Sequence, residues 1–386
     1  MKKAYNETWV DNIENRNTIK DWYDEKVLSK QQYDKAIDLF PVNFYQPNMF
    51  IEFGLFMFTN LALSAAFGFL SITIFQDILN TSTGLAIISL IYCVLLIVFL
   101  EYLIRKRKLY RSGTDNALLY VAIGSLLTAI FSFTDFKWHI SAYFLVSLLV
   151  FIPFLIRYGD PFVAVGIYVA WIALWFSLAI RYPAGKDLLP FIIMGVSAVG
   201  YFITRWWQNK NASAYYADAQ ICIEAGALIT FYVAGNYWFV REGNAFLNNL
   251  ATSVQIKFAL LFYVLTVAVP AVYLVWGLKK QDRKMVLVGV AAAWFDVFTF
   301  RFYFSEIPIE WAMTIGGAFL ASFAVWGIWF FKTPKWGLTS KQTLSAKDRD
   351  FEAFLLSQVL PHQTQQGNKM KFGDGEFGGS GSGSRY

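Results

Sequence analysis

Long apolar stretches constrain this chain more than any other feature of its sequence. A helix needs ~20 predominantly apolar residues to cross ~30 Å of hydrocarbon. Ten stretches of suitable length and character occur between residues 51 and 331, at 51–76, 83–104, 115–133, 138–156, 161–180, 187–204, 220–240, 256–278, 285–303 and 310–331. We therefore predict an all-α fold, a polytopic helical membrane protein of about ten transmembrane helices with the lipid bilayer as its main partner.

The composition excludes several other classes of protein. Of the 386 residues, 56% are hydrophobic and 16% are charged, whereas a soluble domain has ~25% charged residues. So little charge cannot cover a water-facing surface, which argues against a soluble enzyme. The net charge of +6 does not form a basic stripe with interleaved aromatic residues, so we predict no nucleic-acid partner.

Positive charges are distributed unevenly among the predicted loops. The loops at 105–111, 157, 205–210 and 279–284 contain 12 Lys and Arg residues. The intervening loops contain four, or five when Lys257 at the edge of a span is counted. Because Lys and Arg accumulate in cytosolic loops, this pattern predicts that both termini are cytosolic.

Two shorter helical segments are predicted outside the membrane. In the N-terminal segment 1–50, residues 8–40 have the pattern of a helical hairpin, and Ser29 with Gln32 has capping-box spacing. In segment 332–362, an amphipathic helix is predicted at 346–360; it would bind the membrane surface or a partner, or pack on the protein's own loops. Residues 363–386 are Gly/Ser-rich, and we predict that this tail is disordered.

Ionisable residues inside spans are costly and therefore indicate functional sites. Glu224 lies in the seventh predicted span, and Asp296 and Arg301 lie in the ninth. Asp296 and Arg301 are ~140° apart around a helix, so we expect each to find partners on other helices, with Glu224 as one partner for Arg301. One hypothesis is a buried site of Glu224, Asp296 and Arg301 that responds to protons or ions. The alternative is a structural polar clasp, with Arg301 reaching the interface.

Several catalytic chemistries lack their motifs in this sequence. It has two Cys residues and two His residues, no GxxxxGK[ST] phosphate loop and no GxSxG element. We therefore predict a non-enzymatic protein with no metal and no cofactor. An enzymatic alternative would need a cleft that converges on His139 or Asp160.

Three short segments resemble those of a known type of protein. They are residues 19–32 (IKDWYDEKVLSKQQ), Arg301-Phe302-Tyr303 and Gly316-Gly317. With the predicted layout, they make the chain similar to an uncharacterised family of bacterial membrane proteins that join a cytosolic helical segment to a multi-span domain. The resemblance implies location in the bacterial inner membrane, and it implies no activity or catalytic residue.

Two functional hypotheses remain open from the sequence. The first is a channel-like or transporter-like domain in which Glu224, Asp296 and Arg301 line or gate a buried site. The second is a membrane scaffold or assembly subunit that docks partners through the 8–40 hairpin and the 346–360 helix. Small residues four apart, such as Gly289 and Ala293, allow close helix packing and are compatible with a homo-oligomer.

Overall fold

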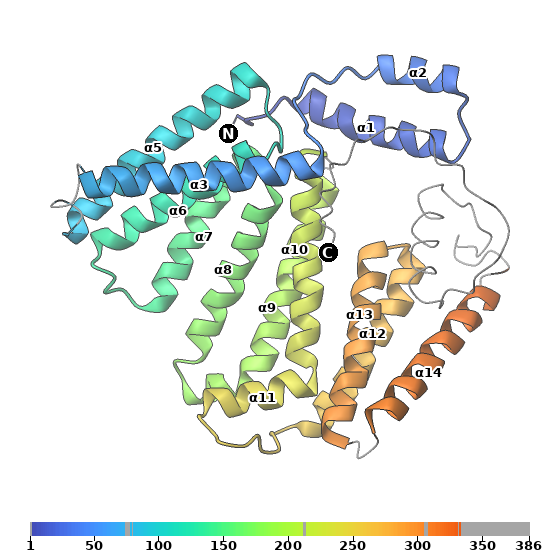
Figure 1. Cartoon of the computed structure of the whole chain (residues 1–386). Helices are drawn as coiled ribbons and strands as arrows, with labels where there is room; N and C mark the ends of the chain where they lie inside the picture. Colours follow the sequence, from blue (N-terminus) through green and yellow to red (C-terminus); the bar gives the residue numbers. More distant parts are fainter. Residues whose placement is uncertain are drawn as a thin grey trace, which may run out of the picture.

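The computed structural model describes residues 2–73, 78, 80–210, 214–304, 308–330 and 332. In these residues every regular element is an α-helix, and the β structure is limited to one isolated bridge between Tyr45 and Leu109. The helices, labelled in Figure 1, are α1 (Glu7–Asp24), α2 (Lys30–Asp38), α3 (Met49–Thr73), α5 (Ser82–Arg107), α6 (Thr114–Phe133), α7 (Ile140–Tyr158), α8 (Pro161–Ala179), α9 (Pro183–Lys210), α10 (Ala214–Gly235), α11 (Tyr237–Leu247), α12 (Ala259–Lys280), α13 (Arg283–Phe304) and α14 (Ile309–Phe330). The predicted all-α fold is confirmed.

Long apolar helices make up most of the chain. Nine of those in the described ranges are long and apolar enough to cross a membrane: α3, α5, α6, α7, α8, α9, α10, α12 and α13. The 22-residue α14 occupies the position of the tenth predicted span. Large apolar side chains on the outer helices are exposed, for example Phe50 on α3 (88%) and Leu260 on α12 (76%). In an integral membrane protein these side chains contact lipid.

Successive long helices run in opposite directions, so the bundle has two ends. The α1–α2 hairpin lies at one end, which we call the hairpin end, together with the turns that join α7 to α8 and α12 to α13 (Figure 1). α11 lies across the opposite end, which we call the α11 end. The helices α8, α9 and α10 run side by side, and the turn that joins α12 to α13 lies part-way along α10 rather than level with its first turn.

The α1–α2 hairpin forms as the sequence predicts, within slightly different limits. At the start of α2 the Gln32 backbone N–H donates to Ser29 Oγ (3.4 Å), and the Ser29 backbone N–H donates to Gln32 Oε1 (2.9 Å). This is the predicted capping box. Between the two helices the rings of Tyr23 and Tyr33 are in contact, with centroids 4.6 Å apart.

The hairpin is held on the membrane domain through its first residues. The Tyr5 hydroxyl donates to Asp115 Oδ2 (2.9 Å), and the Ala4 backbone N–H donates to the Arg157 carbonyl (2.9 Å). Burial, together with the nearby Asp115 carboxylate, raises the pKa of Tyr5 well above its ordinary value. Tyr5 is therefore a neutral donor at physiological pH and fixes the start of the chain to the bundle.

The predicted seventh span, 220–240, needs correction at both ends. α10 begins at Ala214, ends at Gly235, and is followed directly by the separate helix α11. The break occurs because Asn236 has an extended backbone and its side-chain oxygen accepts from the Trp238 backbone N–H (3.0 Å), which caps α11. An apolar sequence pattern does not reveal this local competition for backbone hydrogen bonds.

Two sequence predictions lie outside the described residues. They are the amphipathic helix at 346–360, within segment 332–362, and the Gly/Ser-rich tail at 363–386.

The two residues on which an enzymatic alternative depended both serve as helix caps. His139 Nδ1 accepts from the Ser141 backbone N–H at the start of α7 (3.3 Å). At the start of α8, Asp160 Oδ1 accepts from the Val163 backbone N–H (3.0 Å), and the Tyr120 hydroxyl lies 3.1 Å from both Asp160 carboxylate oxygens. Asp160 lies just outside the span, and burial raises its pKa.

The cap at Asp160 leads to a stability prediction. We expect Asp160→Ala to lower the free energy of unfolding by ~1 kcal/mol because the cap is lost, whereas Asp160→Asn keeps an acceptor and costs less. Because the folded protein retains a proton that the unfolded chain releases, the Asp160 contribution falls as pH rises above the ordinary Asp pKa of ~3.9. Thermal unfolding of both variants in detergent across this pH range tests the prediction. Equal destabilisation by the two substitutions would contradict it.

Candidate functional site

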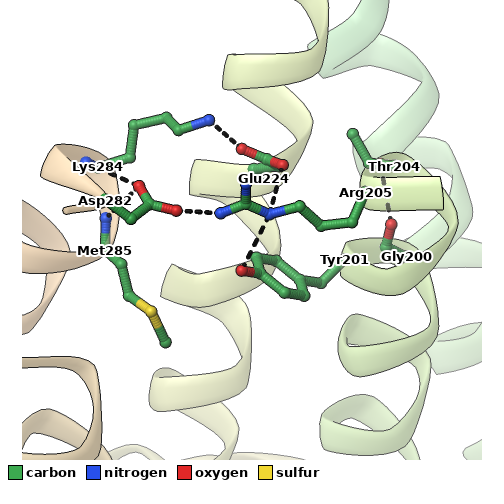
Figure 2. Close-up of polar contacts among 8 residues, drawn as sticks. All are labelled: Gly200, Tyr201, Thr204, Arg205, Glu224, Asp282, Lys284 and Met285. Carbon is green, nitrogen blue, oxygen red and sulfur yellow. Dashed lines mark hydrogen bonds and ion pairs between the residues drawn. The ribbon is translucent and has the colours of Figure 1, made fainter. Parts of the chain in front are cut away.

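Two polar clusters lie at the interface between α10 and α13. The charge cluster consists of Arg205, Glu224, Asp282 and Lys284 (Figure 2). It lies toward the hairpin end, at the turn that joins α12 to α13 (Figure 1). The Asp296 cluster consists of Tyr232, Asn236, Asp296 and Thr299 and lies closer to the α11 end. Apolar residues including Leu228, Val269 and Ala292 pack nearby.

The charge cluster connects three helices through alternating charges. Arg205 on α9 lies with Nε 3.0 Å from Glu224 Oε1 on α10, and its terminal nitrogen contacts Asp282 before α13. Lys284, in the first turn of α13, contacts the other Glu224 oxygen (Figure 2). Arg205 Nε also donates to the Tyr201 hydroxyl (3.1 Å). Because the single Arg205 Nε–H donates to Tyr201, the contact between Arg205 Nε and Glu224 Oε1 is an ion pair without hydrogen-bond geometry.

The charges of this cluster balance one another. The Glu224 side chain is 1% exposed, but those of Arg205 and Lys284 are 37% and 28% exposed, so both cations retain part of their hydration. Asp282 Oδ1 also accepts from the backbone N–H groups of Lys284 (3.2 Å) and Met285 (3.3 Å), which caps α13. With two carboxylates and two cations already paired, this cluster has the properties of a structural clasp.

The Asp296 cluster is arranged differently, around one carboxylate oxygen. The Tyr232 hydroxyl donates to Asp296 Oδ1 (2.7 Å), and Asn236 Nδ2 lies 3.4 Å from the same oxygen. Asn236 Nδ2 also reaches the Tyr232 hydroxyl (2.9 Å) and Thr299 Oγ1 (3.2 Å). All four side chains are buried, and Asn236 has no exposed surface.

The break between α10 and α11 positions this cluster. Asn236 is the connecting residue, and the next backbone N–H, that of Tyr237, donates to Thr266 Oγ1 on α12 (3.0 Å). A discontinuous helix leaves the last carbonyl groups of its first half without their usual helical donors. The Asp296 carboxylate and the last turn of α10 therefore lie in the same part of the bundle.

The donors around Asp296 are all neutral. Among the residues that the structure describes, no Lys or Arg forms an ion pair with Asp296, and its Oδ2 atom accepts no hydrogen bond. An ionised carboxylate in a low-dielectric interior without a countercharge is strongly disfavoured. This arrangement therefore suits a carboxyl group that binds a proton or a cation.

The hydrogen-bond network can accommodate both protonation states of Asp296. Tyr232 has one hydroxyl hydrogen and two acceptors within reach, Asp296 Oδ1 at 2.7 Å and the Ala292 carbonyl at 3.0 Å. With Asp296 ionised, the hydroxyl donates to the carboxylate. With Asp296 protonated, it can turn to Ala292 and accept a hydrogen bond from the carboxylic acid.

No known protein family, curated protein or solved structure matches this chain. In the described ranges, no group of three or more His, Cys, Asp and Glu residues is placed to hold a metal ion.

The structure does not bring Glu224, Asp296 and Arg301 together, which corrects the three-residue site predicted from the sequence. Glu224 pairs with Arg205 and Lys284, not with Arg301. At a rise of 1.5 Å per residue along α13, Asp296 lies ~18 Å from Lys284, and the half-buried Arg301 lies ~26 Å from Lys284. Asp296 and Arg301 do not pair with each other, as their angular separation predicts. The two carboxylates, Glu224 and Asp296, belong to different clusters.

Several residues of both clusters were missed in the sequence. In the sequence, Arg205 and Lys284 lie in predicted loops, and Asn236 is an uncharged residue within the seventh predicted span. A usable signal exists in spacing: Tyr232 and Asn236 are four residues apart, and Asp296 and Thr299 are three apart. Each pair therefore shares one face of its helix, but only the fold shows that the two faces meet.

Proposed function

We propose that this integral membrane protein is a transport protein in which Asp296 takes up and releases a proton. The observation that carries the proposal is the buried Asp296 carboxylate, held by neutral Tyr232 and Asn236 at the break between α10 and α11. Carboxyl groups inside membrane domains are typical of proton relays. Broken helices near such groups are typical of transporter binding sites.

The charge cluster has a separate role in this proposal. It links α13 to α9 and α10 toward the hairpin end, whereas Asp296 links α13 to α10 closer to the α11 end. Glu224 thereby acts as a clasp that keeps α13 aligned with α10. The proton-binding role falls to Asp296 alone.

We further propose that the protein lies in the bacterial inner membrane with both termini in the cytosol. The helix directions support this orientation, because they place the loops with 12 Lys and Arg residues at the hairpin end and those with five at the α11 end. Positive loops remain on the cytosolic side, so the hairpin lies in the cytosol.

Replacing Asp296 tests the proton-binding role directly. In wild-type protein in lipid, we expect infrared spectroscopy to detect the carbonyl stretch of a protonated carboxylic acid that disappears as pH rises. Asp296→Asn removes the titrating group but preserves its shape, so the contribution of Asp296 to this band is expected to be lost, whereas that of Asp160 remains. In proteoliposomes with an internal pH-sensitive dye, the same substitution is expected to lower potential-driven proton flux at least tenfold.

Asp218→Asn is the matched control, because Asp218 is half-exposed and pairs with Arg111 far from this cluster. Its infrared band and proton flux should equal those of the wild type. An Asp296→Asn variant that keeps both the full wild-type band and the flux would overturn the proposal.

One observation favours a second candidate function, a scaffold that docks partners through the hairpin. α2 has no buried residue, and Val27 and Leu39 beside it are 67% and 76% exposed. Exposed apolar groups outside the membrane are typical of protein contacts. The same reconstitution separates the two functions, since a scaffold produces no proton flux in the wild-type protein.

A further inference from the structure

A cavity lies beneath α11, apart from both polar clusters. Its volume is 540 Å³, within the ~300–1,000 Å³ typical of small-molecule sites. Residues from α8, α9, α10, α11 and α12 line it. On α10, Val233 and Ala234 face this cavity, whereas Tyr232 bonds to Asp296 on α13.

The interior of the cavity is apolar and its mouth is polar. Walls from four helices include Phe176, Leu189, Ile193, Val233 and Phe262. Apart from Thr230 on α10, the polar lining residues are at the α11 end, on α11 itself, where α9 begins and where the chain returns from α11 to α12. They are Lys186, Asp187, Asn244, Asn248, Gln255 and Lys257. This is the division of chemistry that an amphiphile requires.

The mouth carries an excess of positive charge. Lys257 Nζ contacts Asp187 Oδ2 at 2.7 Å. Lys186 forms no ion pair with any residue that the structure describes. Two lysines and one aspartate therefore favour an anionic group at the mouth, and the side-chain amide of Gln255 is of a type that donates hydrogen bonds to phosphate or ester oxygens.

The surroundings of the mouth favour a lipid over a water-soluble ligand. Phe246 lines the cavity and is 84% exposed, and Leu188 and Leu260 nearby in the chain are 47% and 76% exposed. Such side chains contact hydrocarbon in a membrane protein, so the cavity lies beside the acyl region of one leaflet. A hydrocarbon chain can enter it without crossing water.

We propose that this cavity binds one acyl chain of a membrane lipid with an anionic headgroup, whose phosphate lies at Lys186 and Lys257. The apolar walls exclude water from the chain, and the net positive mouth selects the headgroup. The site is independent of the proposed proton binding at Asp296.

Gly243 provides a way to fill the cavity. It lies on α11 and lines the cavity, and a Cβ added to it meets no atom within 4 Å. Gly243→Trp therefore introduces bulk without a backbone clash. The matched control is Gly124→Trp, because Gly124 on α6 is exposed and has equal space around it.

The full chain is reconstituted in nanodiscs of equal phosphatidylglycerol and phosphatidylcholine, and retained lipids are counted by native mass spectrometry. Wild-type protein and Gly124→Trp should retain one tightly bound phosphatidylglycerol. Gly243→Trp should lose it. Lys186→Gln combined with Lys257→Gln should retain one lipid but without preference for phosphatidylglycerol.

Equal lipid retention by Gly243→Trp and Gly124→Trp would overturn the acyl-chain site. An unchanged phosphatidylglycerol preference in the double lysine variant would overturn the headgroup assignment. Should Gly243→Trp fail to fold, a lipid with a photoactivatable acyl chain is cross-linked to the wild-type protein. Cross-links to the cavity-lining residues of α8, α9, α10, α11 and α12 support the site, and cross-links only elsewhere contradict it.

Discussion

Glu224→Gln is expected to lower the free energy of unfolding by ~2 kcal/mol, below the ~3–5 kcal/mol for breaking a fully buried ion pair. The substitution leaves Arg205 and Lys284 facing a single carboxylate, that of Asp282. The partial exposure of both cations reduces the penalty, because water screens the charge left over. Thermal unfolding in detergent, followed by tryptophan fluorescence, measures the loss.

The double variant Glu224→Gln with Lys284→Gln provides the control. It removes one charge of each sign, so Arg205 and Asp282 remain as a balanced pair. We expect it to recover a large part of the stability lost in the single variant. A double variant at least as unstable as Glu224→Gln alone would show that charge balance does not hold this interface together.

Asn236→Asp is expected to make the stability of the protein strongly dependent on pH. Aspartate also caps helices well, so the start of α11 is preserved, but a second carboxylate is placed beside Asp296, which is now 3.4 Å from Asn236 Nδ2. Two adjacent buried carboxylates cannot both ionise without large cost. The folded variant therefore holds a proton that the unfolded chain has released.

Because the folded state binds more protons, the stability of Asn236→Asp falls as pH rises above ~4, the ordinary range of carboxyl groups. By neutral pH the loss should reach ~3 kcal/mol, the lower limit for an uncompensated buried charge. Melting temperatures between pH 4 and pH 8 measure it. Adding Asp296→Asn leaves a single carboxyl group at this site, as in the wild type, and should return the profile to the wild-type slope, so a profile as steep as that of Asn236→Asp alone would contradict the prediction.

Local patterns predicted some features correctly and others poorly. The Ser29–Gln32 capping box depends on residues three apart, and it formed as predicted. The end of the seventh span depended on whether Asn236 continues α10 or caps α11. The apolar character of a stretch of sequence does not distinguish these two outcomes. The partners of Glu224 come from residues 205 and 284, and no local pattern reveals which distant charges will be neighbours.

By itself, the sequence determined that this is an all-α membrane protein, because the cost of exposing backbone polar groups to hydrocarbon leaves long apolar segments little choice but helix. It also identified Glu224 and Asp296 as charges that need partners. Only the tertiary structure decided that Glu224 is neutralised by two cations and that Asp296 has neutral donors alone. The difference arises because the penalty for burying a charge depends on what packing places around it, within a few ångströms and from helices far apart in the chain.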